Sequence, residues 1–358
     1  MGNTSAIFMR TTMRIILFLS ISITFFYSCS LLDDNDHDDE KYSVIDTVEI
    51  YMIDIDGSNN IKIADGSNPT YAADLNKIFY RYYDDIYSID LDGTNKKLIA
   101  KTLGHDVHNY YYEIAITPDN RYLFFYSELN NFYDIFRVDI AGSNLINITN
   151  TDSCSETYIR VSPSNENFVY HELFYDSKLN TQYKYGCMSK RNYDGTNYQR
   201  ISCGLIGGSP KYSLNGEYIL THKAYSSYDS TWTRFYLLDA NNYQIVDSCI
   251  LNGIWADGEP ALSNDINVYY SSREENIYKL DLITKQQTEL YIGTTGVYYR
   301  FTSDFKKAII GGYSLRVIDL ENNSSKTILN NLDFNIRDFR ILPDNQSVLY
   351  VKSISHEY

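Results

Sequence analysis

The amino-acid sequence predicts an all-β protein built from a repeated four-stranded unit, and three observations carry this prediction. Asp-Gly and related turn motifs recur between short apolar or aromatic segments along most of the chain. Tyrosine, which favours strands, contributes 36 of the 358 residues. After the first segment of the chain, no long stretch has the 3.6-residue apolar period of an amphipathic helix.

The first repeated element is a hairpin around an Asp-containing turn. The stretch YMIDIDGSNNIKI at 51–63 is followed by YSIDLDGTNKKLI at 87–99, FRVDIAGSNLINI at 136–148 and SKRNYDGTNYQRI at 189–201. Glycine accepts positive φ and the preceding aspartate bonds its own backbone, so each motif indicates a turn between two strands. A calcium loop at Asp54 or Asp90 is the weaker interpretation, because glycine is fourth and the distant glutamate is missing. The residues that open these turns lie about 36 to 53 positions apart, which is typical of propeller units; they are Asp54, Asp90, Asp139, Asn192, Asp239, Asp281 and Asp319.

The second repeated element lies between these hairpins and consists of a polar turn followed by an apolar strand. Seven such blocks align without a gap, and they begin at residues 72, 117, 162, 212, 262, 302 and 342. Each block with its hairpin supplies four short strands, which is the content of a propeller blade. Six complete units run from about residue 68 to 331. The seventh is split between the two chain ends, so we expect a seven-bladed β-propeller closed by pairing of the N- and C-terminal strands.

These motifs resemble the TolB-type repeat, a WD40-like propeller repeat of bacterial periplasmic and surface proteins. The likeness covers nearly all of the chain after its first segment, and it implies fold rather than a particular role. It rests on the hairpin motif and on three further turns, namely Pro118-Asp119-Asn120, Pro163-Ser164-Asn165 and Pro343-Asp344-Asn345.

The first 28 residues read as a targeting segment and not as part of the fold. Arg10 and Arg14 precede a short apolar run that ends at Ser28 and Cys29, and this resembles the signal peptide of a bacterial lipoprotein. The resemblance implies that Cys29 is lipidated. A plain secretory peptide is the alternative. Residues 29–43 are strongly acidic and predict a flexible tether before a single domain at 44–358. We therefore expect a lipid anchor in the outer membrane of a Gram-negative bacterium, on the cell-surface or the periplasmic face.

Apart from Cys29, the sequence has four cysteines, and an oxidising compartment would allow them to form disulfides. Cys187 and Cys203 flank the turn at Asp194 almost symmetrically, so they are expected to form a disulfide across a hairpin. Cys154 and Cys249 have no partner that the sequence identifies, and without a close cysteine pair a zinc site is not expected.

The longest connections between the second and third strands of a unit follow residues 171 and 222, in neighbouring units. Extra loop length on one end of a ring indicates a binding surface. The alternative is that the aromatic side chains of these loops only pack against their own blades. The candidate binding residues in these loops and in the loop near 110 are aromatic: Tyr110, Tyr111, Phe174, Tyr175, Tyr225, Tyr228 and Trp232.

Four histidines are expected at the same end: His105, His108, His171 and His222. The oligogalacturonate lyases are seven-bladed propellers that hold a divalent ion with a histidine cluster, and this likeness implies a metal-dependent polysaccharide lyase as the alternative function. Glu172 would be a partner in that case. Nucleophile-elbow, phosphate-loop and HExxH motifs are missing from the sequence.

The net charge of −15 disfavours nucleic acid as a partner, because phosphate binding needs clustered Lys and Arg. The sequence thus favours a non-enzymatic binding module without a cofactor. We expect a monomer that takes a protein or polysaccharide partner.

Overall fold

The computed structural model describes most of the chain after residue 43, and the account below concerns these residues. The described ranges are 44–83, 85–102, 113–129, 132–164, 166–175, 183–204, 209–226, 230–254, 256–272, 276–293, 298–330, 336 and 338–356. Contacts group Ile45–Ser355 into one compact unit, separate from Met1–Val44 with His356–Tyr358. Cys29, the signal segment and most of the acidic tether therefore lie outside the described residues.

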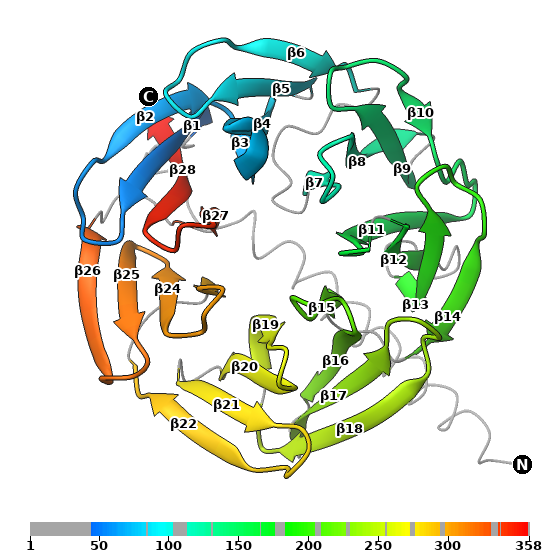
Figure 1. Ribbon diagram of the computed structural model, residues 1–358, viewed down its shortest axis with the longest axis vertical. Coiled ribbons are helices and arrows are strands. Elements are labelled where there is room, and N and C mark those ends of the chain that lie inside the picture. The colour runs from blue at the N-terminus through cyan, green and yellow to red at the C-terminus, as the bar shows by residue number, and fades with distance from the viewer. Residues whose placement is uncertain are drawn as a thin grey trace, which may run out of the picture. The chain divides into compact units, whose positions relative to one another are not determined.

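The compact unit is a ring of seven four-stranded antiparallel sheets, which makes it a seven-bladed β-propeller (Figure 1). We number the blades along the chain and call the strands a to d from the axis outward. A single short 3-10 helix, Ala73–Leu75, accompanies the described strands. The prediction of an all-β propeller with seven blades is thus confirmed.

The first three blades follow one another in chain order. Blade 1 consists of β3 (Ser67–Ala72), β4 (Lys77–Tyr82), β5 (Asp85–Asp90) and β6 (Lys97–Ala100). Blade 2 consists of β7 (Ala115–Ile116), β8 (Tyr122–Leu129), β9 (Phe132–Asp139) and β10 (Ile146–Asn147). Blade 3 consists of β11 (Cys154–Val161), β12 (Asn167–Tyr175), β13 (Tyr183–Asn192) and β14 (Gln199–Cys203).

The next three blades repeat the same order. Blade 4 consists of β15 (Lys211–Tyr212), β16 (Tyr218–Ser226), β17 (Thr231–Asp239) and β18 (Ile245–Asn252). Blade 5 consists of β19 (Ala256–Leu262), β20 (Asn267–Ser272), β21 (Ile277–Asp281) and β22 (Gln287–Tyr291). Blade 6 consists of β23 (Tyr298–Phe301), β24 (Lys307–Gly311), β25 (Ser314–Asp319) and β26 (Ser324–Asn330).

Blade 7 joins the two ends of the chain. From the axis outward it contains β27 (Phe339–Ile341), β28 (Ser347–His356), β1 (Val44–Asp54) and β2 (Ile61–Asp65). Tyr350 of β28 stacks on Tyr51 of β1 at 5.4 Å and donates a hydrogen bond to Asn60. The split blade predicted from the sequence is therefore present, and it closes the ring without leaving an open sheet edge between the ends.

The core of the ring lies between blades. Buried apolar residues form seven clusters, and each cluster joins two neighbouring sheets. One such cluster packs Phe124 of blade 2 against Phe168 of blade 3, with ring centroids 4.9 Å apart. Because side chains alternate along a strand, each blade presents one apolar face to either neighbour, and no blade can bury its faces alone.

The hairpin turns have the geometry that the motif predicts. Gly57 and Gly93 have φ of 86° and 82°, and the amides of both donate to the carbonyls of Asp54 and Asp90. The carboxylate of Asp54 accepts a hydrogen bond of 2.6 Å from Asn59. The carboxylate of Asp54 therefore stabilises a c–d turn.

The gapless alignment of the seven blocks is wrong by one residue in two blades. The hydroxyls of Ser213 and Ser263 accept hydrogen bonds from Tyr218 and Asn267, as the hydroxyl of Thr117 does from Tyr122. The turns of blocks 4 and 5 therefore begin at 213 and 263. In blade 4 the amide donor again lies five residues after the hydroxyl, so the following strand shifts with the turn. In blade 5 it lies four residues on, so the turn is one residue shorter and the following strand keeps its aligned position.

Candidate functional site: the loop end and the axis of the ring

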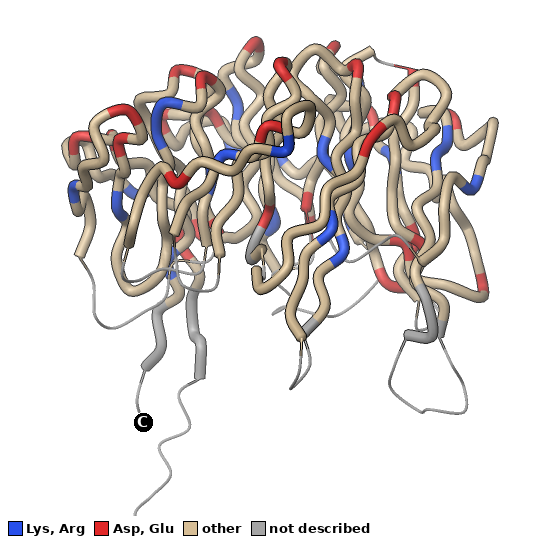
Figure 2. The backbone as a smooth tube through the Cα atoms, turned by 90° about the horizontal axis from the view of Figure 1, so that it is seen from below, with Lys and Arg blue, Asp and Glu red and all other residues tan. Residues whose placement is uncertain are grey.

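The two ends of the ring differ in length of connection and in charge. The b–c and d–a connections lie at one end, which we call the loop end, and the a–b and c–d turns lie at the other, the turn end. Of the Asp and Glu residues that Figure 2 colours, most lie along the turn end. Among the described residues, the loop end is therefore the less acidic of the two.

The aromatic side chains at the loop end include the exposed Tyr225 and the half-buried Trp232 and Phe174. Tyr225 of β16 is 46% exposed and stacks on Trp232 of β17, with ring centroids 5.6 Å apart. Phe174 of β12 lies under the guanidinium of Arg200, 5.0 Å from its ring centroid. Of the other predicted binding residues, Tyr110, Tyr111 and Tyr228 lie outside the described residues, as does the side chain of Tyr175.

Two further exposed tyrosines at this end were not predicted. Tyr83 in the b–c turn of blade 1 is 72% exposed, and Tyr313 in the equivalent turn of blade 6 is 63% exposed. Both lie in short turns, so a search for long loops passes over them. A tyrosine within a tight b–c turn is the sequence feature that would have found them.

The two described histidines point into different blade interfaces. His171 shares a face of β12 with Val169, which packs against Ile219 of blade 4. His222 shares a face of β16 with Leu220, which packs against Leu262 of blade 5. The two imidazoles thus face the interfaces on either side of blade 4.

Both imidazoles are buried and held neutral. Burial and the nearby Arg160 lower the pKa of His171 to about 3, and burial lowers the pKa of His222 to about 4. His105 and His108 lie outside the described residues. Within the described ranges, no group of three or more His, Cys, Asp or Glu side chains is placed to hold a metal ion. Glu172 instead accepts a 3.0 Å hydrogen bond from Arg200.

The structure joins Cys187 and Cys203 in a disulfide across the c–d hairpin of blade 3. Cys154 is buried and Cys249 is half-buried, and both are free thiols.

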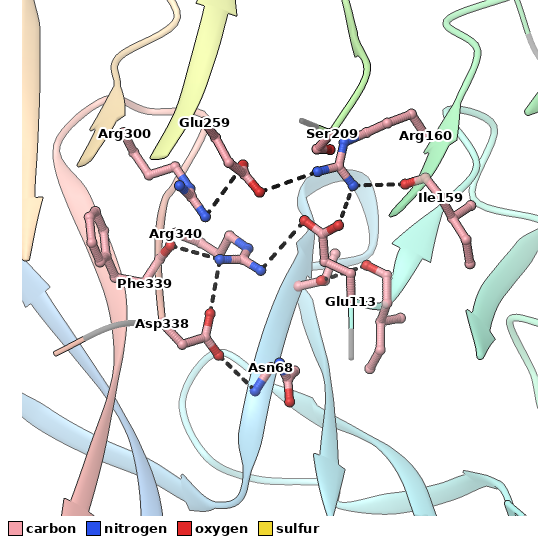
Figure 3. Close-up of polar contacts among 12 residues, drawn as sticks. Asn68, Glu113, Ile159, Arg160, Ser209, Glu259, Arg300, Asp338, Phe339 and Arg340 are labelled. Atoms are coloured by element: carbon pink, nitrogen blue, oxygen red, sulfur yellow. Dashed lines mark hydrogen bonds and ion pairs between the residues drawn. The ribbon is translucent and has the colours of Figure 1, made fainter. Parts of the chain in front are cut away.

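A charged cluster that the sequence analysis missed surrounds the axis of the ring. Side chains from the a strands, or from the residues that lead into them, converge there from six blades (Figure 3). We call these seven residues the axial cluster: Glu113, Arg160, Lys211, Glu259, Arg300, Asp338 and Arg340. Their side chains are 8–26% exposed.

Two glutamates hold this cluster together. Glu113 pairs with Arg160 and, at 3.8 Å, with Arg340. Glu259 pairs with Lys211 at 2.5 Å, with Arg160 at 3.4 Å and with Arg300 at 3.5 Å. One carboxylate is therefore shared by two cations and the other by three.

Asp338 completes the cluster on the side of blade 1. One of its oxygens accepts 2.9 Å from Arg340, and the other accepts 2.9 Å from the amide of Asn68. These contacts tie the innermost strand of the split blade to blade 1.

The pKa shifts of the axial cluster indicate a high local density of positive charge. Burial works to raise the pKa values of Glu113 and Glu259, but the neighbouring guanidinium and ammonium groups outweigh it, and both pKa values are lowered. Burial and the charge of Arg160 lower the pKa of Lys211 to about 8, although Glu259 opposes this. The glutamates stay ionised, and Lys211 is easier to deprotonate than an ordinary lysine.

The pattern that places the cations is readable once the register of the turns is corrected. Arg160, Lys211, Arg300 and Arg340 each stand two residues before the first residue of a block, as in RVS, KYS, RFT and RIL. Glu113 and Glu259 stand two residues earlier still, on the same face of the strand. With the gapless alignment, Pro210 and Pro260 occupy the first of these columns in blades 4 and 5, and the pattern is lost.

Comparison with known proteins gives the fold and no closer relation. No family model matches the chain. No curated protein matches it either. Among solved structures, an oligogalacturonate lyase in complex with manganese is 12% identical over 88% of this chain and 95% of its own, with a TM-score of 0.58.

Two other solved structures are similar. A puromycin-hydrolysing peptidase from Mycobacterium tuberculosis is 15% identical over 76% of this chain, with a TM-score of 0.55, and this chain spans 47% of its length. A TolB from Agrobacterium tumefaciens is 11% identical over 86% of this chain and 98% of its own, with a TM-score of 0.47.

The class of the protein follows from the structure. The chain forms a seven-bladed β-propeller whose blades have the turn and hairpin predicted from the sequence. At identities of 12–15% the likenesses to the peptidase and the lyase show the fold alone, while activity has to be argued from the site. Among the described residues, no helix is long and apolar enough to cross a membrane.

Proposed function

We propose that this chain is a non-enzymatic binding module of the bacterial envelope, which takes a protein or polysaccharide partner at the loop end of its propeller. One observation carries the proposal. Solvent-exposed aromatic rings from three blades occur at the loop end, while acidic residues concentrate at the other. Tyrosine and tryptophan offer large, rigid contact surfaces with a polar edge, which suits both protein and sugar partners.

The stacked pair of Tyr225 and Trp232 on blade 4 is the main contact that we assign to this surface. Each ring fixes the other at 5.6 Å, so little side-chain entropy remains to be lost on binding. Tyr83 and Tyr313 extend the surface over blades 1 and 6.

The anchoring of the module belongs to the same proposal. Residues 1–28 would be removed as a signal peptide, Cys29 would carry the lipid, and residues 29–43 would tether the propeller to the outer membrane. Replacement of Cys29 by Ser is expected to move the protein from the membrane fraction to the soluble fraction. A protein that still sediments with membranes would contradict lipid anchoring while leaving the binding proposal open to its own test.

The binding proposal is tested by capture of partners from intact membranes and by a polysaccharide binding screen. Trp232→Ala and Tyr225→Ala are expected to reduce capture at least about tenfold, because central aromatic anchors supply most of the energy of an interface. Ile283→Ala, at a c–d turn of the turn end and 68% exposed, is the matched control and should leave capture unchanged. Equal capture by all three variants, with unchanged melting temperatures, would remove the loop end as the binding surface.

The alternative lyase function gives a different result. A lyase would cleave polygalacturonate with release of unsaturated ends, and a chelator would abolish this cleavage. A manganese-dependent product, absent in His171→Ala and His222→Ala variants that still fold, would replace the binding proposal.

A further inference from the structure

We propose that Arg300 and Arg340, together with Lys211, form an anion site at the axis of the ring, and that this site binds the carboxylate or phosphate group of a small multivalent anion. The inference concerns the axial cluster and stands apart from the aromatic surface at the loop end.

The first argument is the balance of charge within the cluster. Four cations, Arg160, Lys211, Arg300 and Arg340, meet three carboxylates among the described residues. One positive charge is therefore left over, in a chain whose net charge is −15. Since acidic residues outnumber basic ones over the whole sequence, this local excess of cations runs against the composition.

The second argument is the arrangement of the two arginines. Arg300 and Arg340 come from the innermost strands of adjacent blades, and the guanidinium groups of both belong to the axial cluster (Figure 3). Two guanidinium groups repel each other unless an anion lies between or beside them. Arg340 has Asp338 at 2.9 Å, but its second carboxylate, Glu113, is 3.8 Å away. For Arg300 the nearest carboxylate among the described residues is Glu259, at 3.5 Å.

The third argument is that other cations hold these carboxylates more closely. Glu259 lies 2.5 Å from Lys211, and Glu113 makes its shorter contact with Arg160. Each arginine also donates to the carbonyl of its preceding residue, at 3.0 Å for Arg300 and 2.9 Å for Arg340. A guanidinium has five N–H donors, so the described contacts leave donors for a further oxyanion.

The side chains are placed so that an anion could reach them. They are 22–26% exposed, which admits solvent yet leaves the charges poorly screened. Arg300 is further positioned by the ring of Phe339, 5.8 Å from its guanidinium carbon. The lowered pKa of Lys211 agrees with a positive potential at this point. The planar forks of two arginines match the oxygens of a carboxylate or phosphate, which is the ligand chemistry that arginine recognises best.

Isothermal titration calorimetry with citrate and with inorganic phosphate, at constant ionic strength set by chloride, tests the site. Saturable binding of either anion by the wild-type protein is expected, and the anion that binds more tightly identifies the ligand group. If neither anion gives heat beyond that of chloride, the proposal is overturned.

Variants separate binding from general stability. Arg300→Gln is expected to weaken binding about tenfold, whereas Arg300→Lys, which keeps the charge but loses the fork, should weaken it less. Glu259→Gln raises the excess charge and is expected to tighten binding. A merely structural network would instead lower the melting temperature in both variants without opposite effects on the dissociation constant.

Lys306→Gln is the matched control, because Lys306 pairs with Glu321 on the exposed surface of blade 6. It should bind the anion as the wild-type protein does. If Arg300→Gln binds like the wild-type protein, or if Lys306→Gln weakens binding equally, the assignment of the site to Arg300 and Arg340 is wrong. Should Arg340→Gln fail to fold, the opposed effects of the substitutions at 300 and 259 still decide the question.

Discussion

Glu156 is a fully buried carboxyl group whose pKa is raised by its burial. Its side chain is buried between blades 2 and 3, where Thr151 donates at 2.7 Å and the thiol of Cys154 at 3.3 Å. Burial, with the charge of Asp134, raises the pKa of Glu156 to about 7, although the hydrogen bonds oppose this. Near neutral pH this carboxyl group therefore changes its charge inside the protein.

The raised pKa of Glu156 predicts a loss of stability as pH rises. Between 4.5, the ordinary pKa of a glutamate, and about 7 the folded state holds a proton that the unfolded chain releases. Stability is thus expected to fall through this window and to stay low above it, by up to about 3 kcal/mol. Glu156→Gln should be more stable than the wild-type protein at pH 8 and about equal to it at pH 4.5. Urea unfolding at both pH values measures this, and equal differences at both would contradict it.

Gly66 shows how one residue joins two strands. It lies between β2 and β3 with φ of 145°, and a Cβ there would meet the carbonyl oxygen of Arg81 at 2.3 Å. Since the obstacle is backbone, it cannot move aside as a flexible side chain would.

Replacement of Gly66 by Ala is expected to lower the free energy of unfolding by about 2–4 kcal/mol. Gly204, with φ of 78° and no atom within 4 Å of the place that a Cβ would take, is the control. Gly204→Ala should cost only about 1 kcal/mol, from backbone strain. Chemical denaturation of both variants checks the difference, and similar losses would refute the steric argument.

At the scale of the element, the c–d hairpin of blade 3 is the one that carries a disulfide. Cys187 of β13 lies opposite Cys203 of β14, and the two positions are 16 residues apart along the chain. A crosslink of this span lowers the conformational entropy of the unfolded chain. It also holds β14, an outer strand whose side chains the core does not bury fully.

Removal of this crosslink has a measurable consequence. The double substitution Cys187→Ser and Cys203→Ser is expected to reduce the free energy of unfolding by about 3 kcal/mol. A reducing agent should destabilise the wild-type protein and the Cys249→Ser control alike, but not the double variant. If the reducing agent leaves all three urea midpoints unchanged, the disulfide does not contribute to stability.

At the scale of the whole molecule, closure depends on the two ends of the chain meeting in blade 7. β28 lies between β27 and β1, so its loss would separate the N-terminal strands from the rest of the blade. The cross-contacts include the stacked Tyr51 and Tyr350 and a 3.1 Å hydrogen bond from Ser347 to Asp54.

Deletion of residues 347–358 is therefore expected to open the ring and abolish cooperative unfolding, because β1 would lose its strand partner toward the axis. Deletion of residues 357–358 alone is the control. Circular dichroism melting and limited proteolysis follow the change. A truncated protein with the melting curve of the control would show that the clasp does not hold the ring.

The sequence alone determined the fold because its signals are local and repeated. The conformation of an Asp-Gly turn such as that at Asp54, or of an apolar run such as that at 122–126, can be predicted from a few residues. Seven repeats of such a unit predict a seven-bladed propeller. The facing positions of Cys187 and Cys203 follow from the same local symmetry. Tertiary structure decided the rest. Arg300 and Arg340 lie 40 residues apart in the chain, and only closure of the ring brings their like charges to one axis. His171 and His222 occupy nearly equivalent strand positions, yet strand alternation directs them into the interfaces on either side of blade 4.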